Sequence, residues 1–138
     1  MTLNQLIGNW SFERSISGQG QMTGTAVFSE RPDGLLDYRE VGQLQIANGS
    51  FAFNRSYLYQ VRADGFEVFF DEAPPRLFQR VDLTETAHGL TGSGHHLCPP
   101  DIYDSRYEFH LPNRFLIVHA VDGPRKAYVI RTEFKRQD

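Results

Sequence analysis

The sequence predicts an all-β protein, an antiparallel up-and-down β-barrel of about ten strands with a short helical turn at the N-terminus. Three observations lead to this prediction. Apolar and polar residues alternate along most of the chain, which is the period of a strand with one buried face. Turn signals such as Pro-Asp-Gly and Asn-Gly interrupt the alternation at short intervals. No segment between them is long enough for a crossover helix, so consecutive strands are expected to be antiparallel neighbours.

Only residues 3–7 are expected to form a helical turn. The segments that follow each start or stop at a turn signal, among them Arg31–Gly34 and Asn48-Gly49. A flat sheet of this many strands would expose two long edges, and closure into a barrel removes them. A two-sheet sandwich is the alternative. The predicted strands are residues 10–16, 22–28, 36–46, 53–61, 66–70, 77–83, 90–98, 103–111, 115–121 and 126–134.

Length and composition predict one ordinary globular domain that spans residues 1–138. The formal net charge of −3 gives no general attraction to nucleic acid or to anionic membranes, so we expect neither as a partner. The N-terminus shows no signal peptide, and no apolar run approaches the ~20 residues that span a bilayer. A single cysteine, Cys98, fits a reducing compartment. We therefore expect a cytoplasmic protein that acts alone or as a small homo-oligomer.

The segment from His95 to Tyr103 has the highest density of chemically active side chains in the chain. Two histidines, the only cysteine, an aspartate and a tyrosine fall at the junction of two predicted strands. On a strand His96 and Cys98 share a face, roughly 7 Å apart, so they could hold one ligand between them. Each residue alone also has a structural interpretation, for instance Asp101 as a turn cap and Tyr103 as a core aromatic. As a group they indicate a site.

Alternation along the strands adds further candidates. Tyr103 and Tyr107 are expected to face the interior, as are His119, Lys126 and Tyr128. Gly92-Ser93-Gly94 is interpreted as a kink in its strand.

A second cluster contains Arg14, Tyr38, Glu40, Tyr57 and Tyr59. Arg14 shares a face with apolar residues, which implies a buried guanidinium, and Glu40 is the expected acidic partner. A structural ion pair is the favoured interpretation. Alternatively, Arg14 anchors an acidic group of a ligand.

Two sets of residues resemble known families. Gly8-x-Trp10 resembles the signature of lipocalins and their calycin relatives. That resemblance implies that Trp10 plugs the closed end of the barrel and that an arginine of the last strand, Arg131 or secondly Arg136, packs across it. The chain also resembles a family of uncharacterised single-domain proteins assigned to the calycin-like barrels. The matching motifs are Gly8-x-Trp10 with Arg14, Tyr38-Arg39-Glu40-x-Gly42, His96-x-Cys98-x-x-Asp101-x-Tyr103, and Gly123-Pro124-Arg125-Lys126-x-Tyr128 with Arg131. This family implies a fold but lends no activity.

We expect the barrel to bind a small, partly apolar molecule in its cavity. The candidate ligand-binding residues are His96, Cys98, Asp101, Tyr103, His119, Lys126, Tyr128, Arg14, Tyr38 and Glu40. The first alternative is a cofactor-independent enzyme of decarboxylase or cyclase type, with tyrosine, histidine or glutamate as acid and base. The second is a barrel that binds haem through His96 or His119, or zinc through His96, Cys98, Asp101 and His119. The third is a structural barrel with a packed interior. No spacing typical of a metal site is present, and neither a catalytic residue nor a cofactor follows from the sequence.

Overall fold

The structure, a computed structural model, describes residues 2–137. Ten antiparallel strands form a closed barrel in which each strand pairs with its neighbours in the chain and β1 pairs with β10. The predicted barrel and its N-terminal helical turn, a 3-10 helix named η1, are confirmed. The elements are η1 (Leu3–Leu6), β1 (Gly8–Ile16), β2 (Gly20–Glu30), β3 (Leu36–Ile46), β4 (Gly49–Arg62), β5 (Gly65–Phe70), β6 (Arg76–Thr86), β7 (Gly89–Cys98), β8 (Asp101–His110), β9 (Arg114–Gly123) and β10 (Lys126–Arg136).

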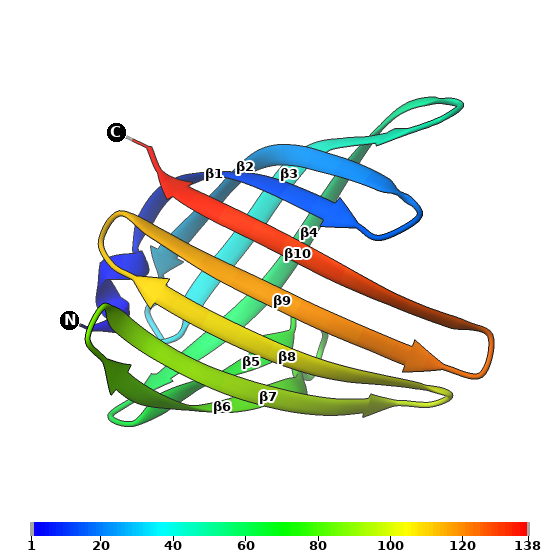
Figure 1. The fold of residues 1–138 in the computed structure, drawn as a ribbon. Helices are drawn as coiled ribbons and strands as arrows, with labels where there is room; N and C mark the ends of the chain where they lie inside the picture. The colour runs from blue at the N-terminus through cyan, green and yellow to red at the C-terminus, as the bar shows by residue number, and fades with distance from the viewer. Residues whose placement is uncertain (1, 138) are drawn as a thin grey trace.

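One end of the barrel is closed and packed. Figure 1 shows η1 at this end, beside the start of β1 and the end of β10. Leu3 and Leu6 of η1 are buried, and the indole Nε1 of fully buried Trp10 donates a hydrogen bond to the Leu6 carbonyl at 2.8 Å. The Phe115 ring meets the indole edge-on at a centroid distance of 4.8 Å. We call this packed end the floor. At the opposite end, which we call the mouth, the hairpin between β3 and β4 projects from the barrel (Figure 1).

Arg136, not Arg131, packs across Trp10, which corrects the first of the two assignments made from the sequence. Arg136 is the ladder partner of Trp10, and its guanidinium lies 4.1 Å from the indole centroid. It donates hydrogen bonds to the carbonyls of Pro112 at 2.9 Å and Ile7 at 2.8 Å. Arg131 lies five residues earlier, on the outward face of β10, where it pairs with Glu133. The register of β1 and β10 therefore decides which arginine reaches the floor.

The wall is incomplete between β6 and β7. Their ladder joins only Asp82–Thr86 to Gly89–Ser93, so pairing stops at the predicted kink around Gly94. In the mouth-side half of this seam, Arg76–Val81 pairs with β5 alone and Gly94–Cys98 pairs with β8 alone. A register shift opposite Val68 makes Phe78 an extra residue of β6, and both Phe78 and buried Gln79 lie on the inner side.

Among residues 2–137, no helix is long and apolar enough to cross a membrane.

Candidate ligand cavity

The mouth-side half of the barrel contains a cavity of about 310 Å³ above the packed aromatic floor. Its walls are mainly aromatic, and Tyr57, Phe70 and Phe78 contribute rings from β4, β5 and β6. Ile117 and Ile130 close the wall on β9 and β10. The cavity also receives polar groups from Arg14, Tyr38, Glu40, Arg55, Cys98, Tyr103, His119, Tyr128 and Thr132. The sequence patterns bring most of these together because strand residues two apart face the same side.

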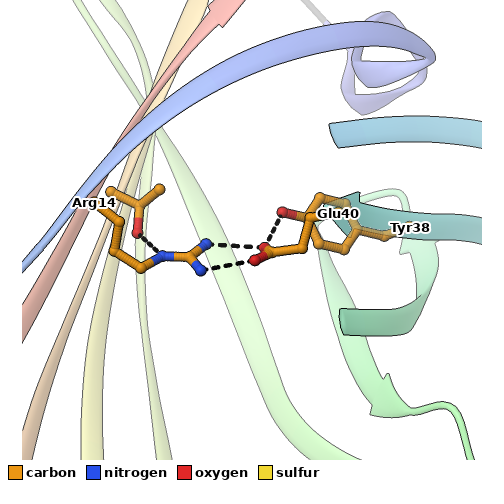
Figure 2. A network of polar contacts seen from close by, with 4 residues as sticks. Arg14, Tyr38 and Glu40 are labelled. Atoms are coloured by element: carbon orange, nitrogen blue, oxygen red, sulfur yellow. Dashed lines mark hydrogen bonds and ion pairs between the residues drawn. The ribbon is translucent and has the colours of Figure 1, made fainter. Parts of the chain in front are cut away.

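Arg14 and Glu40 form a buried ion pair in the wall of the cavity, as the sequence predicts. Arg14 Nη1 and Nη2 donate to the two carboxylate oxygens of Glu40 at 2.7 and 2.8 Å. Arg14 Nε donates to Thr132 at 2.8 Å, and the hydroxyl of Tyr38 donates to Glu40 at 2.6 Å. Figure 2 shows the guanidinium of Arg14 facing the carboxylate of Glu40 end-on, with Tyr38 on the side of the carboxylate away from Arg14. Each nitrogen of Arg14 thus already has a partner within the barrel.

These contacts hold Arg14 in its charged form. Burial alone would lower the pKa of Arg14, but the hydrogen bond and the charge of Glu40 outweigh this effect and raise the pKa above its ordinary value. Burial, together with the negative charge of Glu40, raises the pKa of Tyr38 well above its usual range. Tyr38 therefore stays a neutral hydrogen-bond donor, and the group as a whole is a structural ion pair with one buried tyrosine attached.

A second polar chain ends at His119. The Tyr107 hydroxyl donates to Gln79 Oε1 at 2.7 Å, and Gln79 Nε2 donates to the Ser105 hydroxyl at 2.7 Å. The Ser105 oxygen lies 2.5 Å from His119 Nδ1. The hydroxyl of Ser105 and Nδ1 of His119 therefore share a hydrogen bond whose direction depends on the tautomer of the imidazole. Burial, then the positive charges of Arg14 and Arg55, lower the pKa of His119 to about 4, so the ring is neutral at pH 7.

Three of the candidate residues lie outside the cavity. His96 was expected to share a ligand with Cys98, but its ring fills the open seam, 5.0 Å from the Phe78 centroid and 6.0 Å from that of Phe70. It borders an open groove of about 780 Å³ on the outer wall. Lys126 was expected to point inward, but it begins β10 at the rim, where its side chain is exposed and pairs with Asp101 at 3.3 Å. The other seven candidates line the cavity.

The candidates from the sequence do not include Arg55, which lines the cavity, or Ser105 and Gln79, which connect its lining residues Tyr107 and His119. Arg55 and Ser105 could have been found by alternation, because Arg55 shares a face with Tyr57 and Tyr59, and Ser105 lies between Tyr103 and Tyr107. Gln79 could have been found in the same way, because it shares a face with buried Val81, whereas Phe78 is the extra residue of β6 and does not follow the alternation.

The zinc alternative receives no support from this arrangement. Within residues 2–137, no three His, Cys, Asp or Glu side chains lie close enough to hold one metal ion. Ligation of haem through His96 or His119 stays a prediction.

In chemical terms the carboxylate of the cavity is not a free base. Glu40 accepts three hydrogen bonds, two from Arg14 and one from Tyr38. Burial and the neighbouring Tyr128 raise the pKa of Tyr103 to about 12, so its hydroxyl remains protonated. The acid–base enzyme considered from the sequence stays a prediction, and this arrangement favours binding over proton abstraction.

Comparisons with known proteins bear on the family and the fold. The sequence matches a family of unknown function (DUF6314) over residues 6–136. No curated protein matches it. The structure is similar to an S-type phycobiliprotein lyase (CPES) from Guillardia theta, with a TM-score of 0.65, 10% identity, and coverage of 100% of this chain and 94% of that one. It is also similar to a DUF3598 protein of unknown function from Nostoc punctiforme, with a TM-score of 0.59, 9% identity, and coverage of 99% and 49%. At these identities the likeness concerns the fold alone.

Proposed function

This chain belongs to the DUF6314 family, whose function is unknown, and from the cavity in its barrel we propose that it binds a small, partly apolar molecule there. The observation that carries the proposal is the contrast between the two halves of the interior. The floor half is filled by stacked and edge-on aromatic rings, such as Phe115 and Phe134 at 4.0 Å. The mouth half keeps about 310 Å³ free of side chains. Sites for small molecules usually measure about 300–1,000 Å³.

The lining supports a ligand with both apolar and polar parts. Aromatic rings of Tyr57, Phe70 and Phe78 would contact its apolar surface. Cys98, Tyr103, His119 and Tyr128 would supply polar contacts around it. Arg14, Tyr38 and Glu40 would form a wall of fixed charge, while His96, Asp101 and Lys126 would act only at the seam or the rim. Few, well-placed polar groups in an apolar pocket are typical of specific small-molecule sites.

The direct test fills the cavity. Ile130 lines the cavity, whereas the preceding residue of β10, Val129, points to the outer face of the barrel and is 43% exposed. We expect Ile130→Trp to abolish binding of the neutral fluorescent probe N-phenylnaphthylamine, and Val129→Trp to leave it unchanged. A native mass spectrum of freshly purified protein, compared with its denatured mass, would detect a retained natural ligand. The proposal fails if the wild type does not bind the probe, or if both tryptophan variants bind it equally well.

Cellular location and partners follow from other features. The free thiol of Cys98 is exposed near the mouth, and an exposed cysteine of this kind fits a reducing compartment, so we propose a cytoplasmic protein. The net charge of −3 argues against nucleic acid as a partner. A native mass spectrum would also report whether the protein is a monomer or a small homo-oligomer.

A further inference from the structure

The cavity carries an excess of positive charge although the chain as a whole is acidic. Arg14 and Arg55 both line it, and Glu40 is the acid that faces them. Arg55 is the ladder partner of Glu40 across β3 and β4, so the two side chains start from neighbouring positions on the inner face. Both carboxylate oxygens of Glu40 are nevertheless taken by Arg14, and one of them also by Tyr38. Within residues 2–137, Arg55 has no ion-pair or hydrogen-bond partner.

The remaining charges near the mouth do not neutralise Arg55. Arg76 lines the cavity and pairs with Glu72 at 3.1 Å, and Lys126 at the rim pairs with Asp101 at 3.3 Å. Each of these cations thus has its own acid. The uncompensated positive charge of the cavity therefore lies at Arg55, on a protein with a formal net charge of −3. Such a local reversal of sign favours an anion at this position.

His119 offers a second contact from the opposite wall. β9, which carries His119, is five strands away from β4, which carries Arg55, in either direction around the barrel. Its Nδ1 is occupied by Ser105, which leaves Nε2 as the ring nitrogen available to the cavity. When Ser105 donates its proton to Nδ1, the neutral imidazole carries its own proton on Nε2. A ligand between the two walls would therefore meet a cation on one side and a neutral N–H donor on the other.

We propose that the natural ligand is a small aromatic or apolar anion, whose charged group pairs with Arg55 and whose acceptor atom receives the Nε2 proton of His119. A carboxylate, a sulfonate or an enolate would supply the required chemistry. The inference rests on the proposed function, because it names the class of molecule that the same cavity takes. Arg14 has no part in holding the charged group, since its nitrogens already bind Glu40 and Thr132.

The test compares two probes that share an aryl skeleton and differ in charge. Anilinonaphthalenesulfonate is an anion, and N-phenylnaphthylamine is its neutral counterpart. We expect the wild type to bind the anionic probe more tightly than the neutral one. Arg55→Gln should lower the affinity for the anionic probe by about tenfold, which corresponds to the loss of one partly exposed charge-assisted contact. The affinity for the neutral probe should not change. Arg39→Gln is the matched control, because Arg39 is an exposed arginine on the outer face of β3 that pairs with Asp37.

His119 provides an independent readout. Imidazole nitrogen NMR of the protein without ligand should show the neutral tautomer with its proton on Nε2. Addition of anilinonaphthalenesulfonate should raise the titration midpoint of His119, because a nearby anion stabilises the imidazolium.

The outcomes separate this inference from the proposed function. If the neutral probe binds and Ile130→Trp blocks it, but Arg55→Gln leaves the anion's affinity unchanged, the anionic class is wrong and the binding function stands. If Arg55→Gln and Arg39→Gln lower the affinity for the anionic probe equally, the effect comes from the net charge of the protein, and the inference is also overturned. If neither probe binds the wild type, both proposals fail.

Discussion

The buried pair of Arg14 and Glu40 makes a quantitative prediction about stability. Glu40→Gln removes the negative charge but leaves a side chain of the same shape. Arg14, only 9% exposed, would then face an amide that can accept from one of its two donating nitrogens and presents N–H groups to the other. Breaking one side of a buried ion pair typically costs about 3–5 kcal/mol, and the partial access of Arg14 to the cavity favours the lower end, about 3 kcal/mol. For a domain of this size that loss lowers the Tm by about 10 °C.

Urea unfolding followed by circular dichroism would measure the change, with Glu13→Gln as the control. Glu13 is the exposed neighbour of Arg14 on β1, so this control removes the same charge from the outer face, and its effect should stay within about 0.5 kcal/mol. The double variant Arg14→Met with Glu40→Gln removes the unpaired cation as well. It should be more stable than the sum of the two single losses predicts. A loss below about 1 kcal/mol for Glu40→Gln, or strictly additive losses in the double variant, would refute the reasoning.

Three further predictions concern other parts of the barrel. The pKa of His119 is lowered from 6.5 to about 4, so on acidification the unfolded chain takes up this proton before the folded protein does. The free energy of unfolding should therefore fall as the pH drops from about 6.5 to about 4. The difference in Tm between wild type and His119→Gln, followed across this range, measures the contribution of His119. Arg136→Lys should cost about 2 kcal/mol in urea unfolding, because lysine cannot reach several carbonyls and stack on Trp10 at once, whereas Arg131→Lys should change little; equal effects would contradict the assignment of Arg136 to the floor. Trp10→Ala should cost roughly 3–5 kcal/mol, and a variant that melts like the wild type would show that the floor is not part of the core.

The strands could be predicted from the sequence because alternation and turn residues act locally. The Arg14–Glu40 pair could be predicted as well, since a buried guanidinium among apolar residues requires an acid nearby. For the partner of Trp10, alternation along β10 places Arg136 on the face of buried Phe134 and Arg131 on the outward face, but the position of Arg136 opposite Trp10 depends on the pairing of β1 with β10. Lys126 shares the alternation of the inner face, but the wall ends at its position, so its side chain turns to Asp101 at the rim.

The site was harder to predict wherever the sheet departs from regular pairing. His96 does not line the cavity with Cys98; β7 has no ladder partner in β6 at this point, and the His96 ring packs against Phe78 of β6. Phe78 enters the lining of the cavity as the extra residue of β6, which no local pattern predicts. The chain from Tyr107 to His119 joins inner-face residues of β6, β8 and β9. Its existence could be established only from the fold.

Because the ladder between β6 and β7 is short, the barrel is held together by backbone hydrogen bonds over only part of the length of this seam. Only five residue pairs, all near the hairpin turn, fasten the two strands together. Beyond them the circumference of the mouth can change by bending the two strands, with no ladder hydrogen bond broken. Backbone amides along the slit should exchange with solvent far faster than those of the floor, where each strand is paired on both sides. Elastic widening of this kind would let a bulky molecule enter a narrow cavity while the rest of the cylinder keeps its shape.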